Sequence, residues 1–276
     1  MTVPSALQTD AVHTSTSVAA AVAERLAVAG CVAAEEEADE LVAAAPDEDV
    51  LDGWVRRREQ GEPLAWITGT MLFCGRPLRV GPRVYVPRYE TEELARRAAA
   101  HLVDAAARDL LRVPRAADLC TGAGAVAAHL ASAVPEAKVV GVDIDPRAVT
   151  CARRNGVAAV RSDLDAPLRS GAFDVVTAVA PYVPRQDIAF LPADVRRYEP
   201  RRALDGGDDG LDVVRRVVVG AARLLRPGGW LLAEVGGDQD ELVIPSLTAA
   251  GFATPASWRD EDGDLRGVAA RMPAAR

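Results

Sequence analysis

Residues 117–127 read ADLCTGAGAVA, and this stretch decides the fold. An apolar strand pattern leads into it, and an Ala-rich helix pattern, AVAAHLASAV, follows. Gly122 and Gly124 therefore lie in the turn between a strand and a helix, where glycine lets the backbone approach a ligand and the first helical amides point at it. The spacing also fits G-x-G-x-x-A, a dinucleotide-binding pattern that is weak when it stands alone.

Strand and helix patterns continue to alternate after this turn. The runs KVVGVDI, PRAVTCARRNG, VAAVRSD and FDVVTAV follow one another with turn signals between them. Further on, LDVVRRVVVGAARLL predicts a helix, PGG a break and WLLAEVG another central strand. Such alternation is typical of a parallel sheet with crossover helices, so the expected fold class is α/β with a Rossmann-like sheet.

Two acidic residues end the strands that follow the glycine turn. Asp143 stands 21 residues after Gly122 (143 − 122), where a carboxylate can accept both ribose hydroxyls of a nucleoside. Asp163 ends the next strand and can meet an adenine amino group. The pattern predicts a nucleoside cofactor and leaves S-adenosylmethionine and a nicotinamide dinucleotide open. An oxidoreductase needs a proton-transfer residue, and the histidines, His13, His101 and His129, offer no clear candidate.

The chain before this sheet has a different organisation. Residues from about 15 to 60 carry apolar residues at helical spacing, and Gly30 falls where a helix would stop. We expect a helical domain over residues 1–62, a hairpin linker over 63–90, where Gly and Pro break short apolar runs, and the main domain over 91–276. Thr91 is expected as the N-cap of the helix that opens this main domain.

Composition limits the possible partners. The formal net charge of −8 argues against sequence-independent nucleic-acid binding, and the basic run RRYEPRR, residues 196–202, is more typical of a solvated face. The cysteines, Cys31, Cys74, Cys120 and Cys151, show no CxxC spacing and predict neither a metal site nor disulfides. No signal peptide and no apolar run of membrane-spanning length is present, so the sequence predicts a cytoplasmic protein without a membrane partner.

Seven segments in order give the chain a specific resemblance: GEPLAWITG, VPRYETEEL, ADLCTGAGAVA, GVDIDPRAVTCARRN, PYVP, LPADVRRYEPRRALDGGDDGLDVVRR and LLRPGGWLLAEVGGDQ. Together they resemble the bacterial protein-(glutamine-N5) methyltransferases that modify peptide chain release factors. The resemblance implies a helical domain that docks the release factor, a protein substrate, and methyl transfer from S-adenosylmethionine by in-line displacement without a metal. It also implies a cofactor site built from Asp118, Thr121, Gly122, Ala123, Gly124, Asp143 and Asp163.

The same resemblance places the substrate loop, Asn-Pro-Pro-Tyr in the family, at Val179, Ala180, Pro181 and Tyr182. In the family, the Asn side chain and the carbonyl of the first Pro accept hydrogen bonds from the target amide, and the Tyr packs on it. Ala180 keeps a carbonyl, and a branch of the family with no established substrate varies this position. Val179 offers no acceptor, and an unsatisfied buried amide N–H costs about 1–3 kcal/mol.

Three interpretations stay open on this loop. The first is a working glutamine methyltransferase in which the Ala180 carbonyl, with water or Gln186, completes the amide site. A second is a cofactor-binding homologue with weak or no transfer. The third is a methyltransferase for a nucleophile that needs fewer hydrogen bonds. Asn155 is the only asparagine in the chain and lies far from the loop in the sequence.

Overall fold

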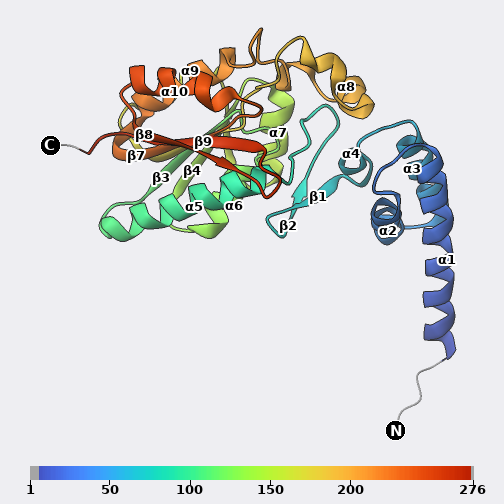
Figure 1. Ribbon diagram of the computed structural model, residues 1–276. Coiled ribbons are helices and arrows are strands. Elements are labelled where there is room, and N and C mark those ends of the chain that lie inside the picture. The colour runs from blue at the N-terminus through green and yellow to red at the C-terminus, as the bar shows by residue number, and fades with distance from the viewer. Residues whose placement is uncertain (1–5, 275–276) are drawn as a thin grey trace.

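The computed structural model describes residues 6–274 of the chain, and a seven-stranded sheet forms its larger part (Figure 1). The strands lie in the order β5-β4-β3-β6-β7-β9-β8. Their bounds are β3 (Arg115–Leu119), β4 (Lys138–Asp143), β5 (Ala158–Arg161), β6 (Phe173–Ala178), β7 (Leu225–Glu234), β8 (Ala253–Arg259) and β9 (Leu265–Arg271). Neighbours from β5 to β7 are parallel, and β9 pairs antiparallel with both β7 and β8. The expected α/β Rossmann-like class is confirmed.

Helices cover both faces of this sheet (Figure 1). Helices α5 (Thr91–Arg108), α6 (Ala125–Ala133) and α7 (Pro146–Arg154) lie on one face, and α9 (Asp212–Leu224) and α10 (Gln239–Ala249) lie on the other. The apolar patterns explain this arrangement. Helix α5 buries Leu94, Ala98 and Leu102 at a spacing of four, and every residue of β6 is buried because both of its faces are covered.

Two local predictions are wrong. Thr91 is the first residue of α5 and not its N-cap, which is Glu90, and the Thr91 hydroxyl donates to the Glu234 carboxylate at 2.6 Å. The Thr91 hydroxyl, expected to cap the helix, is thus hydrogen-bonded to the buried Glu234 carboxylate instead. The PGG segment does not break the chain before the last central strand. It lies inside β7, and the pairing of β7 with β6 shifts between Phe173 and Val175 to accommodate it.

The order of the strands creates a crevice. The chain moves outward from β3 to β4 and β5 and then returns to β6, on the other side of β3. Connections leave the carboxyl ends of β3 and β6 in opposite directions, and ligands of open parallel sheets bind at such a switch point. The glycine loop follows β3 and the segment that starts at Val179 follows β6, so both meet at this edge.

The N-terminal helices form their own core. They are α1 (Ala6–Val28), α2 (Ala34–Ala44) and α3 (Glu48–Glu59), joined by the short α4 (Leu64–Thr68). Their buried residues include Leu26, Leu41 and Val55, and Arg25 forms ion pairs with Glu59 and Asp52. Helix α1 ends two residues before Gly30, which has a φ of 88° and closes the helix as the sequence predicts.

A hairpin and two aromatic residues join these helices to the sheet. Strands β1 (Thr70–Phe73) and β2 (Arg76–Arg79) form the predicted hairpin, and α8 (Ala193–Tyr198) lies beside the junction. The Trp66 Nε1 donates to the Val84 carbonyl, and the Tyr198 hydroxyl donates to the Gln60 carbonyl, both at 3.0 Å. The two rings meet edge to face at 6.2 Å. The junction is therefore packed and hydrogen-bonded.

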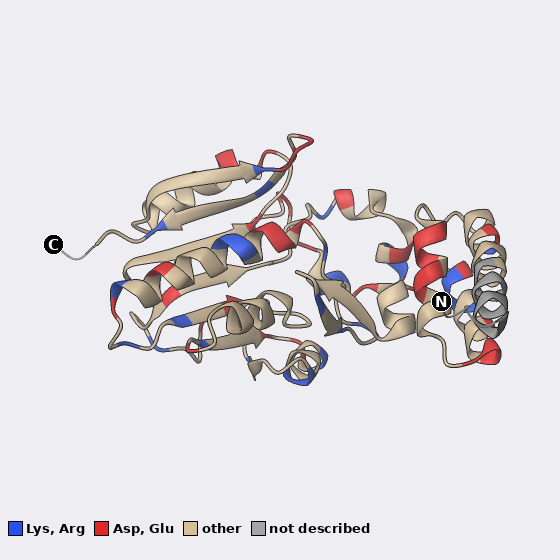
Figure 2. Cartoon of the chain, turned by 90° about the horizontal axis from the view of Figure 1, so that it is seen from below, with Lys and Arg blue, Asp and Glu red and all other residues tan. Residues whose placement is uncertain are grey.

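Charge is unevenly distributed between the two parts. Residues 1–62 hold 13 acidic and 4 basic residues, a net charge of −9 in a chain whose total is −8. Figure 2 shows many of these acidic positions on the helices at the N-terminal end of the molecule. The sheet and its helices are close to neutral in comparison. Among the described helices, none is long and apolar enough to span a membrane.

Candidate active site

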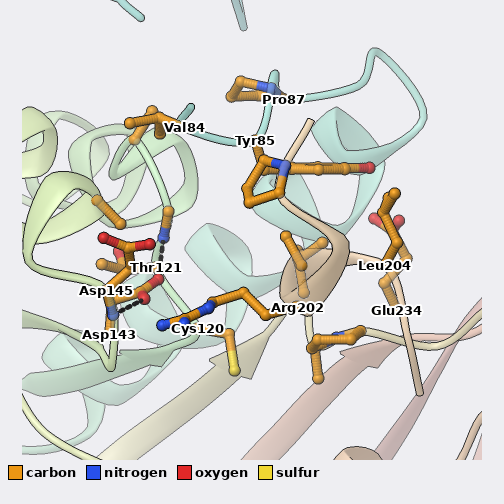
Figure 3. Close-up of a pocket in the computed structure, with 18 of the residues that line it drawn as sticks. Val84, Tyr85, Pro87, Cys120, Thr121, Asp143, Asp145, Arg202, Leu204 and Glu234 are labelled. Atoms are coloured by element: carbon orange, nitrogen blue, oxygen red, sulfur yellow. Dashed lines mark hydrogen bonds between the residues drawn. The ribbon is translucent and has the colours of Figure 1, made fainter. Parts of the chain in front are cut away.

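A cavity of about 550 Å³ opens at the switch point of the sheet (Figure 3). This volume suits a small-molecule ligand. The residues predicted for the site that line it are Asp118, Thr121, Gly122, Ala123, Asp143, Asp163, Val179, Ala180, Pro181 and Tyr182. Gly124 is the one predicted residue outside the lining. The structure therefore brings the predicted cofactor residues and the predicted substrate loop into one cavity.

The glycine loop is shaped by left-handed backbone conformations. Gly122 has a φ of 55° and Gly124 a φ of 83°. A Cβ on Gly124 would come within 3.0 Å of Ala152 and Val157 side-chain atoms, so this glycine lets α6 pack closely against α7 and the residue before β5. A Cβ on Gly122 would meet nothing within 4 Å. Gly122 therefore faces open space and Gly124 serves packing.

Asp143 is tied directly to this loop. Its Oδ2 accepts the Gly122 N–H at 2.9 Å, and its Oδ1 accepts the Asp145 N–H at 2.8 Å. Burial raises the pKa of the Asp143 carboxyl, and these backbone hydrogen bonds oppose the rise. Each oxygen retains a further lone pair, so the carboxylate can accept hydroxyl donors from the cavity. Ribose binding by Asp143 stays a prediction, for which this carboxylate has free acceptor capacity.

Asp118, near the end of β3, stabilises the glycine loop through hydrogen bonds. Its two oxygens accept the hydroxyls of Thr121 at 2.6 Å and Thr177 at 2.7 Å. The residue is 2% exposed, and burial raises the pKa of its carboxyl to about 6, against the effect of these two hydrogen bonds. Asp118 and Thr121 thus fix the end of β3 to β6 and to the glycine loop. Both carboxylate oxygens of Asp118 therefore already have hydrogen-bond donors from the protein.

Two arginines line the cavity on the side of Asp163: Arg216, and Arg202, the last residue of the basic run 196–202. The Arg216 guanidinium donates to Oδ2 of Asp163 at 2.7 Å, and both side chains are about half exposed. Arg202, from the segment after α8, extends toward Cys120 and Asp143 in Figure 3. Burial raises the pKa of the Cys120 thiol, which keeps it neutral. Arg216 belongs to no spacing pattern, and the solvated face expected for the run 196–202 does not hold for Arg202, which lines the cavity.

The substrate loop is held by its backbone. The Tyr182 carbonyl accepts the Gln239 Nε2–H at 2.8 Å, and the Val183 N–H donates to the Leu204 carbonyl at 3.0 Å. Ala180 is 3% exposed, and the Tyr182 ring packs at the edge of the core on the α9 side. Burial raises the pKa of the Tyr182 phenol, which stays protonated. The loop is therefore fixed without the ring of the family's first Pro.

Neither amide side chain discussed for this loop reaches it. Gln186 is exposed and does not line the cavity, so the idea that it completes the amide site is wrong. Asn155 instead bridges two segments: its Oδ1 accepts the Arg79 N–H at 2.9 Å, and its Nδ2 donates to the carbonyls of Arg79 and Ala123, each at 2.8 Å. This asparagine joins the hairpin to the glycine loop.

Glu234 is a residue of the site that sequence reasoning missed. It ends β7, is 4% exposed and lines the cavity. Burial raises the pKa of its carboxyl, and the Thr91 hydroxyl and the Tyr182 phenol oppose this rise as hydrogen-bond partners. The single acid in the buried run WLLAEVG was a signal for it, since an acid at the carboxyl end of a central strand faces the ligand edge of such a sheet.

The histidines do not support a hydride-transfer site. His101 stacks on Trp230 at 4.1 Å, and burial lowers its pKa. Neither His101 nor His129 lines the cavity. His13 lies in the part of α1 whose side chains are not described. The proton-transfer residue that a dinucleotide oxidoreductase requires is thus not supplied by a described histidine.

Solved structures support the fold. The hMettl16 catalytic domain in complex with MAT2A 3'UTR hairpin 1 matches with a TM-score of 0.53 at 13% identity, covering 82% of each chain. This likeness concerns the fold alone. A family model described as "Methyltransferase domain" matches residues 116–198, which contain the glycine loop, Asp143 and the substrate loop.

Curated relatives define the family. Release factor glutamine methyltransferase of Geobacter sulfurreducens is 39% identical over 229 residues, covering 80% of this chain and 77% of that protein. The enzyme of that name from Streptomyces coelicolor is 39% identical over 272 residues, covering 90% of this chain and 94% of that protein. The 4-amino-L-phenylalanine/4-methylamino-L-phenylalanine methyltransferase of Streptomyces pristinaespiralis is 40% identical over 223 residues, covering 78% and 76%. The comparisons give no support to an oxidoreductase, and the chain belongs to the release factor glutamine methyltransferase family.

Proposed function

We propose that this protein transfers a methyl group from S-adenosylmethionine to the side-chain amide nitrogen of a glutamine in a peptide chain release factor. The observation that carries the proposal is the single cavity that holds both the Gly122–Asp143 pair and the loop from Val179 to Tyr182. The names of the relatives, at 35–42% identity, support the same substrate.

The residues around Asp143 fit this cofactor. The Asp143 carboxylate is positioned for the two ribose hydroxyls, the Gly122 backbone leaves room for the chain of the ligand, and Ile144, 51% exposed, offers an apolar surface to the adenine. Asp163 is proposed for the adenine amino group, since the Arg216 contact uses only its Oδ2. When bound, S-adenosylmethionine supplies a methyl group on a sulfonium.

The substrate loop would orient the amide. An amide nitrogen is a poor nucleophile because its lone pair is delocalised into the carbonyl, so the site must align it with the sulfur–methyl bond. The Ala180 carbonyl can accept one N–H of the amide, and the Tyr182 ring can pack on its flat face. Val179 cannot accept the second N–H, so the family's arrangement is incomplete at this residue.

A second candidate substrate is an aromatic amine. The relative from Streptomyces pristinaespiralis is named for methylating 4-amino-L-phenylalanine. An aryl amine keeps more of its lone pair than an amide and needs fewer hydrogen bonds to react, which agrees with an apolar side chain at Val179. This candidate keeps the same cofactor site and the same nitrogen chemistry.

One assay separates these candidates. The purified protein and a Val179→Asn variant are incubated with labelled S-adenosylmethionine and either a release factor or 4-amino-L-phenylalanine. We expect wild type to label a release-factor glutamine at a rate within about threefold of the variant. If the Val179→Asn variant is about 100-fold faster than wild type, wild type is a homologue with weak transfer. This rate ratio corresponds to a difference of about 2.7 kcal/mol in activation free energy. Labelling of the amine alone supports the second candidate, and failure to bind the cofactor in calorimetry overturns every methyl-transfer assignment.

The division of the chain has a proposed function as well. Residues 1–62 are proposed to dock the protein substrate, and residues 91–276 to catalyse methyl transfer. Residues 63–90 are proposed to connect these two parts. The separate core of α1 to α3 supports this division. The packed contact between Trp66 and Tyr198 supports a fixed orientation of the docking helices relative to the cavity.

A further inference from the structure

Glu234 places a carboxylate beside the position where the family's loop carries Asn. Ala178 pairs with Ala233 in the parallel ladder of β6 and β7, so the next residues, Val179 and Glu234, are neighbours at the carboxyl edge. Residues paired in this way point to the same face of a sheet. Val179 packs with the cluster on the α5 side, and Glu234 bonds to Thr91 of α5, so both side chains lie on that face.

The carboxylate is buried and aimed into the cavity. Glu234 is 4% exposed, and the Thr91 hydroxyl donates to its Oε2 at 2.6 Å. In Figure 3 its oxygens point to the same region as the ring of Tyr85. A buried carboxylate is costly unless partners satisfy it. A side chain held in this way is a fixed acceptor for a donor that enters the cavity.

Besides Thr91, the groups facing Glu234 come from three segments. Tyr85 and Glu90 belong to the stretch before α5, Tyr182 to the substrate loop, and Arg266 to β9. Glu90 raises the pKa of the Glu234 carboxyl, while Arg266 and the Tyr182 hydrogen bond lower it, and burial is the largest effect and raises it. Glu234 thus faces one carboxylate, one guanidinium and two phenols that stay neutral.

We propose that Glu234 orients the methyl-accepting nitrogen in this protein, by accepting the N–H that Val179 cannot, and takes up its proton. The inference rests on the proposed function. As the carbon–nitrogen bond forms, the sulfur–methyl bond breaks and its electron pair returns to sulfur, which becomes a neutral thioether. The nitrogen becomes cationic and releases one proton to the Glu234 carboxylate. The same step serves a glutamine amide or an aromatic amine.

Four variants test this role: Glu234→Ala, Glu234→Gln, Val179→Asn, and the double variant Val179→Asn/Glu234→Ala. We expect Glu234→Ala to lower kcat/KM by about 100-fold, the scale of losing one positioned acceptor or base. Because Asn at 179 restores an acceptor, the double variant should recover about tenfold of that loss. Asp240→Asn is the matched control, since Asp240 is also buried and acidic but does not line the cavity.

A pH profile separates proton uptake from a structural role. If the Glu234 carboxylate must be ionised, kcat at saturating cofactor falls as pH falls through its raised pKa. Glu234→Gln keeps the size and one acceptor oxygen but cannot titrate, so its acid limb should move to lower pH. Calorimetry with S-adenosylmethionine should give the same dissociation constant, within about twofold, for wild type and all variants.

Two results on the methylation rate would overturn the inference while leaving the function intact, and a third, on cofactor binding, would do the same. One is a Glu234→Ala enzyme that methylates its substrate within threefold of wild type. The other is a Glu234→Gln enzyme with the wild-type acid limb. Loss of cofactor affinity in Glu234→Ala would also assign the residue a structural role and reject the inference. If neither wild type nor Val179→Asn labels a release factor or the amine, the proposed function is wrong. The inference, which rests on that function, is then wrong as well.

Discussion

At the scale of single residues, Asp118 makes the fold sensitive to pH. Burial raises the pKa of its carboxyl to about 6, above the ordinary value of about 3.9. The folded state therefore binds a proton more readily than the unfolded chain, and the contribution of this group to stability is fully present below pH 4 and is lost as pH rises through 6. The shift corresponds to about 3 kcal/mol.

Asp118→Asn tests this effect, because Asn does not titrate, keeps an acceptor oxygen for one threonine hydroxyl and presents an N–H donor to the oxygen of the other. We expect wild type to gain stability relative to the variant, by up to about 3 kcal/mol, as pH falls from 7 to 4. Urea unfolding at several pH values measures the difference. A constant gap between the two proteins across this range would contradict the prediction.

A local spacing in the sequence predicted which residues lie together, while the cofactor-binding role of these residues stays a prediction. Gly122 and Asp143 were found because a turn and a strand end lie a fixed distance apart in this sheet, and the 2.9 Å hydrogen bond between them is the physical reason. Glu234 and Thr91 were missed as a pair because they are 143 residues apart and meet only through packing of α5 on β7. The same contact explains why the N-cap expected at Thr91 is wrong.

At the scale of elements, the hairpin is held to the glycine loop by Asn155. Its side chain makes three hydrogen bonds, two to Arg79 of β2 and one to Ala123. Asn155→Ala should destabilise the fold by about 1–3 kcal/mol and loosen the hairpin. Hydrogen exchange of the Arg79 amide, which donates to this side chain, should accelerate, while the core amides of β6 should change only with global stability.

Asn155→Asp is the matched control for this element. It keeps the oxygen that accepts the Arg79 N–H and removes the two donors, so Arg79 should remain protected while the link to Ala123 is lost. Cofactor affinity should fall in both variants, because both free the glycine loop. An Arg79 amide that exchanges equally in wild type and Asn155→Ala would show that the hairpin is held by other contacts.

Elements were predictable when their burial was uniform. Strand β6 is buried along its whole length, and its apolar run stood out in the sequence. Strand β8 is mostly exposed, with the pattern of an edge, and no comparable run marked it. The antiparallel β8–β9 pair was therefore absent from the sequence prediction, and its position beside β7 depends on contacts such as Trp230 opposite Arg271.

At the scale of the whole molecule, the N-terminal helices that are proposed to dock the substrate are strongly acidic. Residues 1–62 carry a net charge of −9, and Glu35, Glu36 and Asp39 of α2 are exposed. If this part docks a protein substrate, charge complementarity should affect association with that substrate and leave the cavity unchanged. The sequence could predict the helices but not their orientation, which depends on the Trp66 and Tyr198 contacts.

Reversing the three charges on α2, Glu35→Lys/Glu36→Lys/Asp39→Lys, tests the docking role. We expect KM for the release factor to rise about tenfold, equivalent to about 1.4 kcal/mol, while KM for a short glutamine peptide and the cofactor dissociation constant stay constant. Raising the salt concentration should reduce the difference in this KM between wild type and the variant, since salt screens exposed charges. Glu136→Lys/Glu261→Lys/Asp262→Lys reverses three exposed acids outside these helices and is the matched control. Equal effects of the two triple variants would mean that net charge alone, and not α2, governs association.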